Sequence, residues 1–168
     1  MKSIFKLLVA AFLTVAPLTV TAQSNVAHIN VQQLISEMPE VIAAQNELAK
    51  LEKDYTTQID NAFKEFQTKA QSYSSDAANQ TDVTNQARQK ELESMQTNLQ
   101  EFRDSAAQEL QKKQMDLMTP LLEKARNAIT KVGEEQGFNY VIDSSPNGGI
   151  ILANGKDLLA DVKKELGF

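Results

Sequence analysis

The chain has 168 residues, of which 42% are hydrophobic and 23% charged, with a formal net charge of −5 at pH 7, no Cys, no Trp and one His. These proportions exclude a collagen-like or fully disordered chain, and the lack of Cys excludes disulfide scaffolds, zinc sites built on Cys and cysteine nucleophiles. All six Gly lie at position 133 or later, and Pro39 and Pro120 are the only prolines between residues 18 and 145. About a hundred residues are therefore almost free of helix breakers, which predicts a largely helical chain.

Residues 1–22 have the features of a secretory signal peptide. Two lysines flank the start of an apolar run at Leu7–Leu13, and the segment ends in Val20-Thr21-Ala22, which suits cleavage after Ala22. A membrane anchor is the alternative, and it is disfavoured because the apolar run is short and Pro17 interrupts its continuation. We therefore expect an exported, soluble protein.

Export makes the chain more acidic. Residues 1–22 hold two of the 17 basic residues and none of the 22 acidic ones, so the remaining 146 residues carry a formal net charge of −7. Such a chain is repelled by nucleic acid and gains little from anionic lipid headgroups. Nucleic acid is therefore not an expected partner, and a membrane surface is a poor one.

The first segment after the signal peptide has the alternation of a half-buried strand. Ala27, Ile29 and Val31 recur at every second position. A short amphipathic segment follows at 32–38. Pro39 then stands where a long helix can begin, because proline is tolerated in a first helical turn.

Two long apolar stripes with helical spacing follow, separated by a polar cluster at 74–82 that suits a turn. The first stripe contains Val41, Ala44, Leu48, Leu51, Tyr55, Ile59, Phe63, Phe66, Ala70 and Tyr73. The second contains Val83, Ala87, Leu92, Met95, Leu99, Phe102, Ala106, Leu110, Leu117, Leu121, Ala125, Ile129 and Val132. This spacing predicts an antiparallel, coiled-coil-like helical hairpin over 39–132, called the arm below, with a kink before Pro120.

After the arm, apolar residues again recur at every second position, as in a strand. Phe138, Tyr140 and Ile142 predict one strand and 150–153 another, joined as a hairpin through a loop at 144–148. Asp157 is placed to cap a final short helix that ends at Gly167. The expected fold class is therefore α+β, with a small β-rich body built from 23–38 and 133–168 and the arm extending from it.

This arrangement cannot bury its own apolar surface. Each helix of a two-helix arm covers only one side of the other, and three short strands leave open sheet edges. Oligomerisation through the body would cover those edges. The candidate residues for this contact are Ala27, Ile29, Tyr140, Ile142, Ile150 and Leu152.

The residues resemble a known family, the Skp/OmpH-like periplasmic chaperones. The resemblance rests on the long hairpin and on Ala27–Asn30, Phe138–Asp143, Gly149–Leu152 and Asp157–Val162. It implies a homotrimer with a β-rich body whose helical arms enclose a cavity. It also implies that unfolded outer-membrane proteins are held there in the periplasm without ATP, before their insertion into the outer membrane.

The arm departs from the family in its charge. Familiar members have strongly basic arms, whereas residues 40–131 here hold 12 Lys and Arg against 15 Asp and Glu. Binding of lipopolysaccharide or phospholipid headgroups is therefore not expected, and client capture should depend on apolar contacts with weak salt dependence.

The functional hypothesis is a periplasmic, ATP-independent holdase without cofactor or metal. Candidate client contacts near the tip are Phe63, Phe66, Tyr73, Met95 and Phe102, with plain helix packing as the alternative for each. His28 is interpreted as structural, and Asp143-Ser144-Ser145 as the end of a strand, so an enzyme is not expected. The runner-up is an envelope scaffolding protein without clients.

Overall fold

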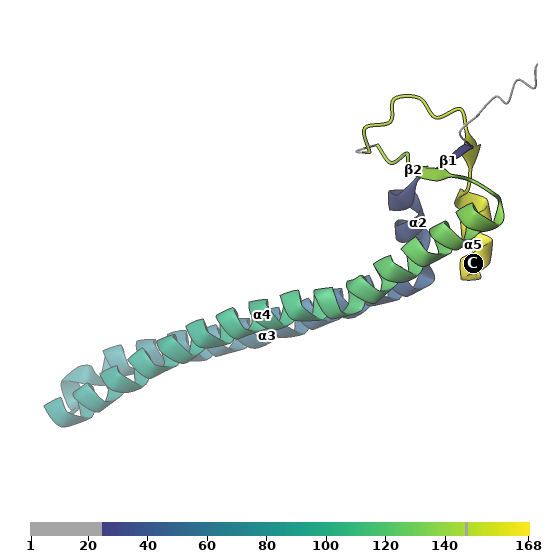
Figure 1. Ribbon diagram of the computed structural model, residues 1–168. Helices are drawn as coiled ribbons and strands as arrows, with labels where there is room; N and C mark the ends of the chain where they lie inside the picture. The colour runs from purple at the N-terminus through teal and green to yellow at the C-terminus, as the bar shows by residue number, and fades with distance from the viewer. Residues whose placement is uncertain (1–24, 147) are drawn as a thin grey trace, which may run out of the picture.

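The computed structural model describes residues 25–146 and 148–168, so the predicted signal peptide at 1–22 lies outside the described residues. Figure 1 shows a long two-helix arm with a small body at one end, which confirms the predicted fold class. The elements in chain order are β1 (Val26–Ile29), α2 (Val31–Glu37), α3 (Pro39–Asp76), the 3₁₀ turn η1 (Ala77–Asn79), α4 (Asp82–Glu135), β2 (Tyr140–Asp143), β3 (Lys156–Asp157) and α5 (Leu159–Leu166).

Pro39 stands where the sequence predicts the start of the first long helix, and α4 begins with a side-chain cap. Pro39 stands in the first turn of α3, and the hydroxyl of Thr81 accepts a 3.2 Å hydrogen bond from the backbone N–H of Thr84 at the start of α4. At 54 residues, α4 is about 81 Å long at 1.5 Å per residue. Glu40 pairs with Lys124 near the body and Asp76 with Arg88 near the tip, so α3 and α4 run in opposite directions.

Pro120 lies inside α4 without ending it. The helix is continuous from Asp82 to Glu135, and Figure 1 shows a gradual curve along the arm rather than a break. The predicted kink is thus replaced by a distributed bend. The packing of α3 along the same length supports α4 where proline removes one backbone hydrogen bond.

The sheet differs from the predicted hairpin. Its strand order is β2-β1-β3, and both outer strands are parallel to β1. A parallel neighbour requires the chain to cross back to the starting end of the sheet. The chain makes this return between β2 and β3, and for that reason the predicted strand at 150–153 is wrong. The third strand is the two-residue β3, which pairs Ala27 with Lys156.

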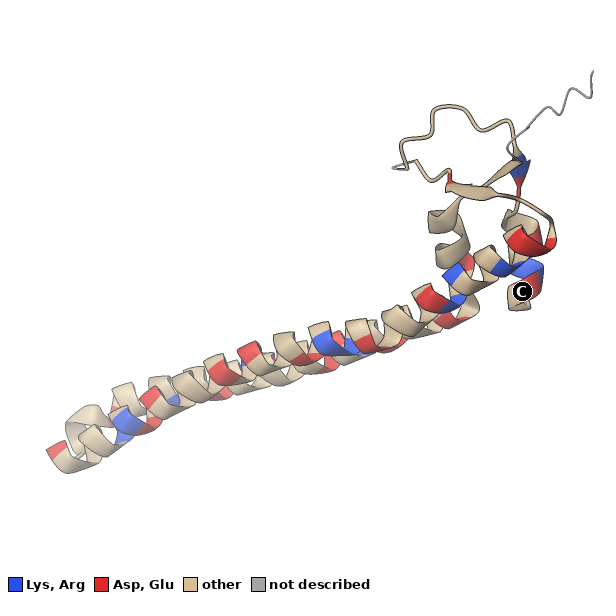
Figure 2. Ribbon diagram, in the orientation of Figure 1, with Lys and Arg blue, Asp and Glu red and all other residues tan. Residues whose placement is uncertain are grey.

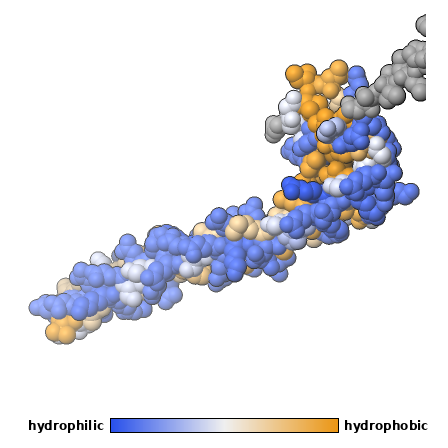
Figure 3. All heavy atoms as spheres, viewed as in Figure 1, coloured by the Kyte–Doolittle hydropathy of each residue, from blue (hydrophilic) through white to orange (hydrophobic). Residues whose placement is uncertain are grey.

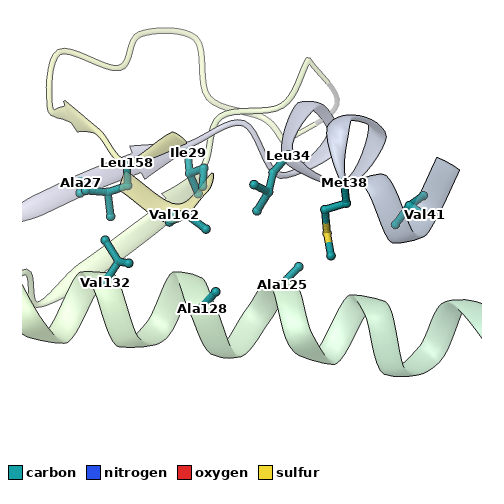
Figure 4. Packing of buried hydrophobic residues seen from close by; sticks show 10 residues of the cluster. All are labelled: Ala27, Ile29, Leu34, Met38, Val41, Ala125, Ala128, Val132, Leu158 and Val162. Atoms are coloured by element: carbon teal, nitrogen blue, oxygen red, sulfur yellow. The ribbon is translucent and has the colours of Figure 1, made fainter. Parts of the chain in front are cut away.

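The core of the protein lies beneath the sheet, where the last turns of α4 meet α2 and α5 (Figure 4). Leu158 and Val162 carry α5 into this core, and both are fully buried. The N-cap residue of α5 is Leu158 rather than the predicted Asp157. The carboxylate of Asp157 still accepts a 2.9 Å hydrogen bond from the N–H of Leu159, the first residue of the helix. The cluster comprises Ala27, Ile29, Leu34, Met38, Val41, Ala125, Ala128, Val132, Leu158 and Val162.

Within residues 25–146 and 148–168, no helix has the length and apolar character needed to cross a bilayer. Over the same ranges, no three side chains of His, Cys, Asp or Glu gather as a metal site would require.

Candidate functional site

Charged and polar pairs join the two helices along one side of the arm. Lys124 binds Glu40 at 2.5 Å and Lys113 binds Glu47 at 2.8 Å, and Lys69 binds Glu91 closer to the tip. Figure 2 shows acidic and basic residues interspersed along both helices, as these pairs require. We call the side of the arm that carries these pairs the ion-pair side.

Two tyrosines add to this set of contacts. The hydroxyl of Tyr55 donates to Glu109, and that of Tyr73 donates to Glu91 at 2.5 Å. The hydrogen bond to its carboxylate partner is the main cause that raises the pKa of each tyrosine. Both hydroxyls therefore stay protonated throughout the neutral pH range, so each can continue to donate.

The pKa values of the acidic partners are shifted in the opposite direction. The hydrogen bond from Lys124 lowers the pKa of Glu40, and hydrogen bonds from Lys69 and then Tyr73 lower the pKa of Glu91. These carboxylates are thus charged at neutral pH. Because each is already paired with a cation of the other helix, it contributes little net charge to the surface of the arm.

The predicted client-contact residues divide into two groups. Phe63 is 40% exposed. Tyr73, Phe102 and Met95 are only half-buried, and contacts within the arm hold two of them: Phe102 packs edge-on against Tyr55 with ring centroids 6.1 Å apart, and the guanidinium of Arg88 lies 4.6 Å from the ring centre of Tyr73.

Phe66, the fifth predicted contact, is half-buried and borders an open hollow of about 710 Å³ on the outside of α3. Its neighbours there are Gln67, Thr68, Ala70 and Gln71, none of which is charged. Of the five predicted residues, Phe63 is exposed and Phe66 borders an open hollow, whereas Tyr73 and Phe102 are engaged between the helices.

Sequence reasoning missed four exposed apolar residues of the arm. Ile42 is 46% exposed, Met115 55% and Leu122 45%, and Val83 at the tip is 77% exposed. Val83 belongs to the second of the two predicted stripes, whereas the other three residues lie outside both stripes. The signal that could have found those three was their position off the regular spacing, because an apolar residue there faces away from the partner helix.

The body presents a second exposed apolar surface on the outer face of the sheet. An open hollow of about 570 Å³ lies there, and Figure 3 shows apolar residues gathered on the body while the visible face of the arm is mainly hydrophilic. Tyr140 is 63% exposed and Leu152 76%. Ile142 and Ile150 border the same hollow and are also exposed.

Two residues predicted for oligomerisation lie elsewhere. Ala27 and Ile29 are 0% and 1% exposed within a single chain, because their side chains point from β1 toward α4 and α5 (Figure 4). They are part of the core and are not available to a second copy. The remaining candidates for this role are Tyr140, Ile142, Ile150 and Leu152.

The only histidine, His28, lies on the outer face of β1. Its Nδ1 is 3.2 Å from the hydroxyl of Ser144. The carboxylate of Asp143 instead accepts hydrogen bonds from the hydroxyl and the N–H of Ser145, at 2.6 and 2.9 Å. His28, Ser144 and Asp143 therefore do not form a relay in which a carboxylate orients the histidine.

One family model covers the arm, the parallel sheet and the closing helix α5. Residues 25–166 match the model of the family described as outer membrane protein (OmpH-like). The chain belongs to the OmpH-like family. The resemblance seen in the sequence is thereby confirmed.

Two curated relatives of this OmpH-like chain are named chaperone protein Skp. The protein of Yersinia enterocolitica is 27% identical over 148 residues, which cover 85% of this chain and 86% of the relative. That of Pectobacterium atrosepticum is 21% identical over 151 residues, 90% of each chain. Both alignments extend over nearly the full length of the relatives.

A solved structure supports the same fold. The crystal structure of an OmpH-like protein from Caulobacter crescentus CB15 superposes with a TM-score of 0.77 and covers 86% of this chain and 85% of its own. The two sequences are 12% identical. A likeness at that level establishes the shared OmpH-like architecture alone, and the site residues of this chain must be argued from its own geometry.

Proposed function

We propose that this protein is a periplasmic, ATP-independent holdase chaperone that binds unfolded outer-membrane proteins and prevents their aggregation before insertion into the outer membrane. Membership of the OmpH-like family and two relatives named as chaperones support the general role. The observation that carries the proposal is the arm itself. It leaves Ile42, Phe63, Met115 and Leu122 each between 40% and 55% exposed along a thin two-helix rod.

Exposed apolar residues of this kind suit weak, repeated contacts. Each one can bury only part of its surface against a partner, so a single contact stabilises a complex by about 1 kcal/mol at 25 cal/mol per Å². Several contacts on one arm, and more on neighbouring arms, raise the total affinity through effective concentration. A client that later buries its own apolar surface in a membrane can therefore leave without an energy source.

We further propose that the protein acts as a homotrimer joined through the outer face of the sheet. The sheet has three strands, and β2 and β3 both have an open edge in the single chain. Tyr140, Ile142, Ile150 and Leu152 are the candidate contact residues, because all four are exposed and the last three border one hollow. Covering that hollow and those edges together is what a symmetric assembly would do.

Sedimentation equilibrium tests the assembly. The wild-type protein is expected at three times the chain mass, and Ile142→Glu is expected to shift it toward the monomer by placing a charge in the contact. Val83→Glu is the matched control, since it adds the same charge at an exposed apolar position at the arm tip. A wild-type monomer at all concentrations would overturn the trimer.

Periplasmic location depends on the predicted signal peptide. Amino-terminal sequencing of the protein recovered from the periplasmic fraction is expected to begin at Gln23, with residues 1–22 removed. Recovery of an uncleaved chain with the inner membrane would instead support the anchor alternative.

Chaperone activity is tested by aggregation. A urea-unfolded outer-membrane porin is diluted into buffer with and without an equimolar amount of assembled protein, and light scattering is followed over time. The proposal expects scattering to be suppressed in the absence of ATP. Unchanged scattering would contradict the holdase and favour the scaffolding alternative, in which the arms serve as spacers without clients.

A further inference from the structure

The segment between β2 and β3 holds both places in the sequence where asparagine is followed directly by glycine. These are Asn147-Gly148 and Asn154-Gly155. The second pair lies wholly within the described residues, and Asn154 is exposed there, outside any helix or strand. Its side-chain amide is therefore open to water, and the residue that follows has no side chain to shield the peptide bond between them.

A pair of this kind has a reaction of its own, deamidation. The backbone nitrogen of the glycine attacks the side-chain Cγ of the asparagine, so a new C–N bond closes a succinimide ring. The bond from Cγ to the amide nitrogen breaks, and ammonia leaves with the proton given up by the attacking nitrogen. Water then opens the ring at either carbonyl carbon. The product is aspartate, or isoaspartate, in which the main chain runs through the side-chain carbon.

The surroundings of Asn154 favour this attack. Gly155 turns freely about its backbone bonds. Ile151 is fully exposed and Leu152 largely exposed, so the segment makes few packing contacts before it reaches β3, and Figure 1 shows it bowing outward from the sheet.

Asn139 provides the contrast within the same chain. It is also exposed and lies outside any helix or strand. The nitrogen that would attack its side chain belongs to Tyr140 and already donates a 3.4 Å hydrogen bond to the carbonyl of Asn25. The bulky side chain of Tyr140 hinders the attack further. Exposure alone therefore does not give Asn139 the reactivity expected of Asn154.

Asn154 borders the hollow on the outer face of the sheet, together with Ile142, Ile150 and Leu152. Among the described residues that line this hollow, His28 is the only one whose side chain can carry a charge. Conversion of Asn154 to an acid adds a carboxylate at the border of this surface. A second copy that covers the hollow would have to remove that carboxylate from water, which is costly without a paired cation.

The isoaspartyl product also lengthens the main chain directly before β3. Gly155 approaches β1 so closely that a Cβ on it would stand 2.7 Å from the carbonyl oxygen of Val26. The strand that follows pairs only Lys156 and Asp157 with β1. An added main-chain atom at this point therefore displaces a strand that has few hydrogen bonds to hold it in place.

We propose that Asn154-Gly155 is a site of spontaneous deamidation, and that the acid formed there weakens the contact between copies of the chain through the outer face of the sheet. The modification itself requires only water and the residues of one chain. Its effect on assembly rests on the proposed trimer. Assembly would thus decline with the age of the protein molecule.

Peptide mapping by mass spectrometry tests the modification. The wild-type protein is incubated in mildly alkaline buffer, which promotes attack by removing the backbone proton, and fragment ions locate the acid formed at each asparagine, so that Asn154 is distinguished from Asn147. Asn154 is expected to convert several-fold faster than Asn139 and to give both aspartate and isoaspartate. Conversion at Asn154 that is no faster than at Asn139 would overturn the site.

Sedimentation equilibrium tests the effect on assembly. Asn154→Asp introduces the charge of the product without lengthening the main chain, and Asn154→Gln is the matched control that keeps an amide. Asn154→Asp is expected to associate several-fold more weakly than wild type and Asn154→Gln. Equal association of all three would overturn the effect on assembly while leaving the trimer intact. A wild-type monomer at all concentrations would overturn the proposed trimer and this effect with it, whereas the mapping decides the modification by itself.

Discussion

The hydroxyl of Tyr73 in α3 donates a 2.5 Å hydrogen bond to the carboxylate of Glu91 in α4. Lys69, one turn earlier in α3, binds the same carboxylate. Glu91 therefore accepts from two residues of the other helix near the tip of the arm. This is the region with the fewest buried apolar contacts, so polar contacts contribute a larger share of the local stability there.

Acid is expected to loosen the tip through Glu91. The pKa of Glu91 is lowered in the folded protein, chiefly by the hydrogen bond from Lys69 and then by that from Tyr73. A carboxyl group with a lowered folded pKa stabilises the folded state above its unfolded pKa of about 4.5, and this stabilisation is lost as the pH falls through the folded value. The midpoint of thermal unfolding, followed by circular dichroism, should therefore fall more between pH 6 and pH 3 in wild type than in Glu91→Gln.

Glu93→Gln is the control for this effect. Glu93 lies two residues further along α4, and its carboxylate accepts from Gln89 of the same helix rather than from α3. Its substitution should leave the acid sensitivity of wild type in place. Equal pH profiles for wild type and Glu91→Gln would show that the contact across the arm does not stabilise the tip.

The free energy of unfolding should depend on Leu34 in the body far more than on the exposed residues of the arm. Leu34 of α2 is fully buried in the core cluster. Leu34→Ala is expected to cost roughly 2–5 kcal/mol of unfolding free energy, from lost burial and the cavity left behind. Val83→Ala, at a position 77% exposed, should stay within about 0.5 kcal/mol of wild type. Urea unfolding at one fixed protein concentration measures both, and similar losses would contradict the placement of the core.

Gly133 is expected to be required by the close approach of α4 to β2. A Cβ at this position would stand 2.8 Å from Cγ2 of Val141. Alanine would add up to about 1 kcal/mol of helix propensity, but the stiff β-branched valine of a paired strand can move only by shifting β2. Gly133→Ala should therefore lower stability despite the better helix former.

A double-mutant cycle tests the cause. In Val141→Ala the facing methyl group is absent, so Gly133→Ala should cost much less in that background than in wild type. Additive losses would mean that the clash with Val141 is not the reason Gly133 is needed. Both free energies come from urea unfolding at matched concentrations.

The helices of the arm could be predicted from sequence because their signals are local. Pro39 fixes the start of α3, Thr81 caps α4, and the three-and-four spacing between them is read from single residues. The strand at 26–29 and the closing helix near Gly167 could be predicted from local signals as well. Each depends on neighbours within a few positions of the chain.

The sheet could not be predicted because its pairing is not local. The apolar run at 150–153 has the composition of a strand, yet Ile151 is fully exposed. Its residues are used to return the chain to the starting end of β1, a need that follows from parallel pairing and is invisible in the run itself. The alternation of Ala27, Ile29 and Val31 likewise predicted a buried face, although Val31 begins α2. It could not say whether Ala27 and Ile29 are covered by α4 or by a second copy.

The exposed residues of the arm could be predicted only in part, because their exposure also depends on non-local packing. The regular stripes include Phe102 and Tyr73, whose rings are engaged between the helices. Ile42, Met115 and Leu122 are exposed because they lie off those stripes.

Client binding is expected to depend weakly on salt. Raising the salt concentration from 0.1 M to 1 M shortens the Debye length from about 10 Å to about 3 Å and removes most attraction between exposed charges. Residues 40–131 hold 12 Lys and Arg against 15 Asp and Glu, so the arm offers little net charge to a client, and contact through Phe63 or Met115 is not screened. The dissociation constant for an unfolded porin, measured by fluorescence anisotropy, should therefore change by less than about threefold over this range.

Two variants identify the source of the affinity in that titration. Met115→Gln replaces an exposed apolar side chain by a polar one of similar length, and it should weaken binding by a similar factor at low and high salt. Lys112→Gln, beside Lys113 on the ion-pair side, should leave the dissociation constant nearly unchanged at both salt concentrations. A steep loss of wild-type affinity with salt, together with a strong effect of Lys112→Gln, would show that charge rather than apolar contact holds the client.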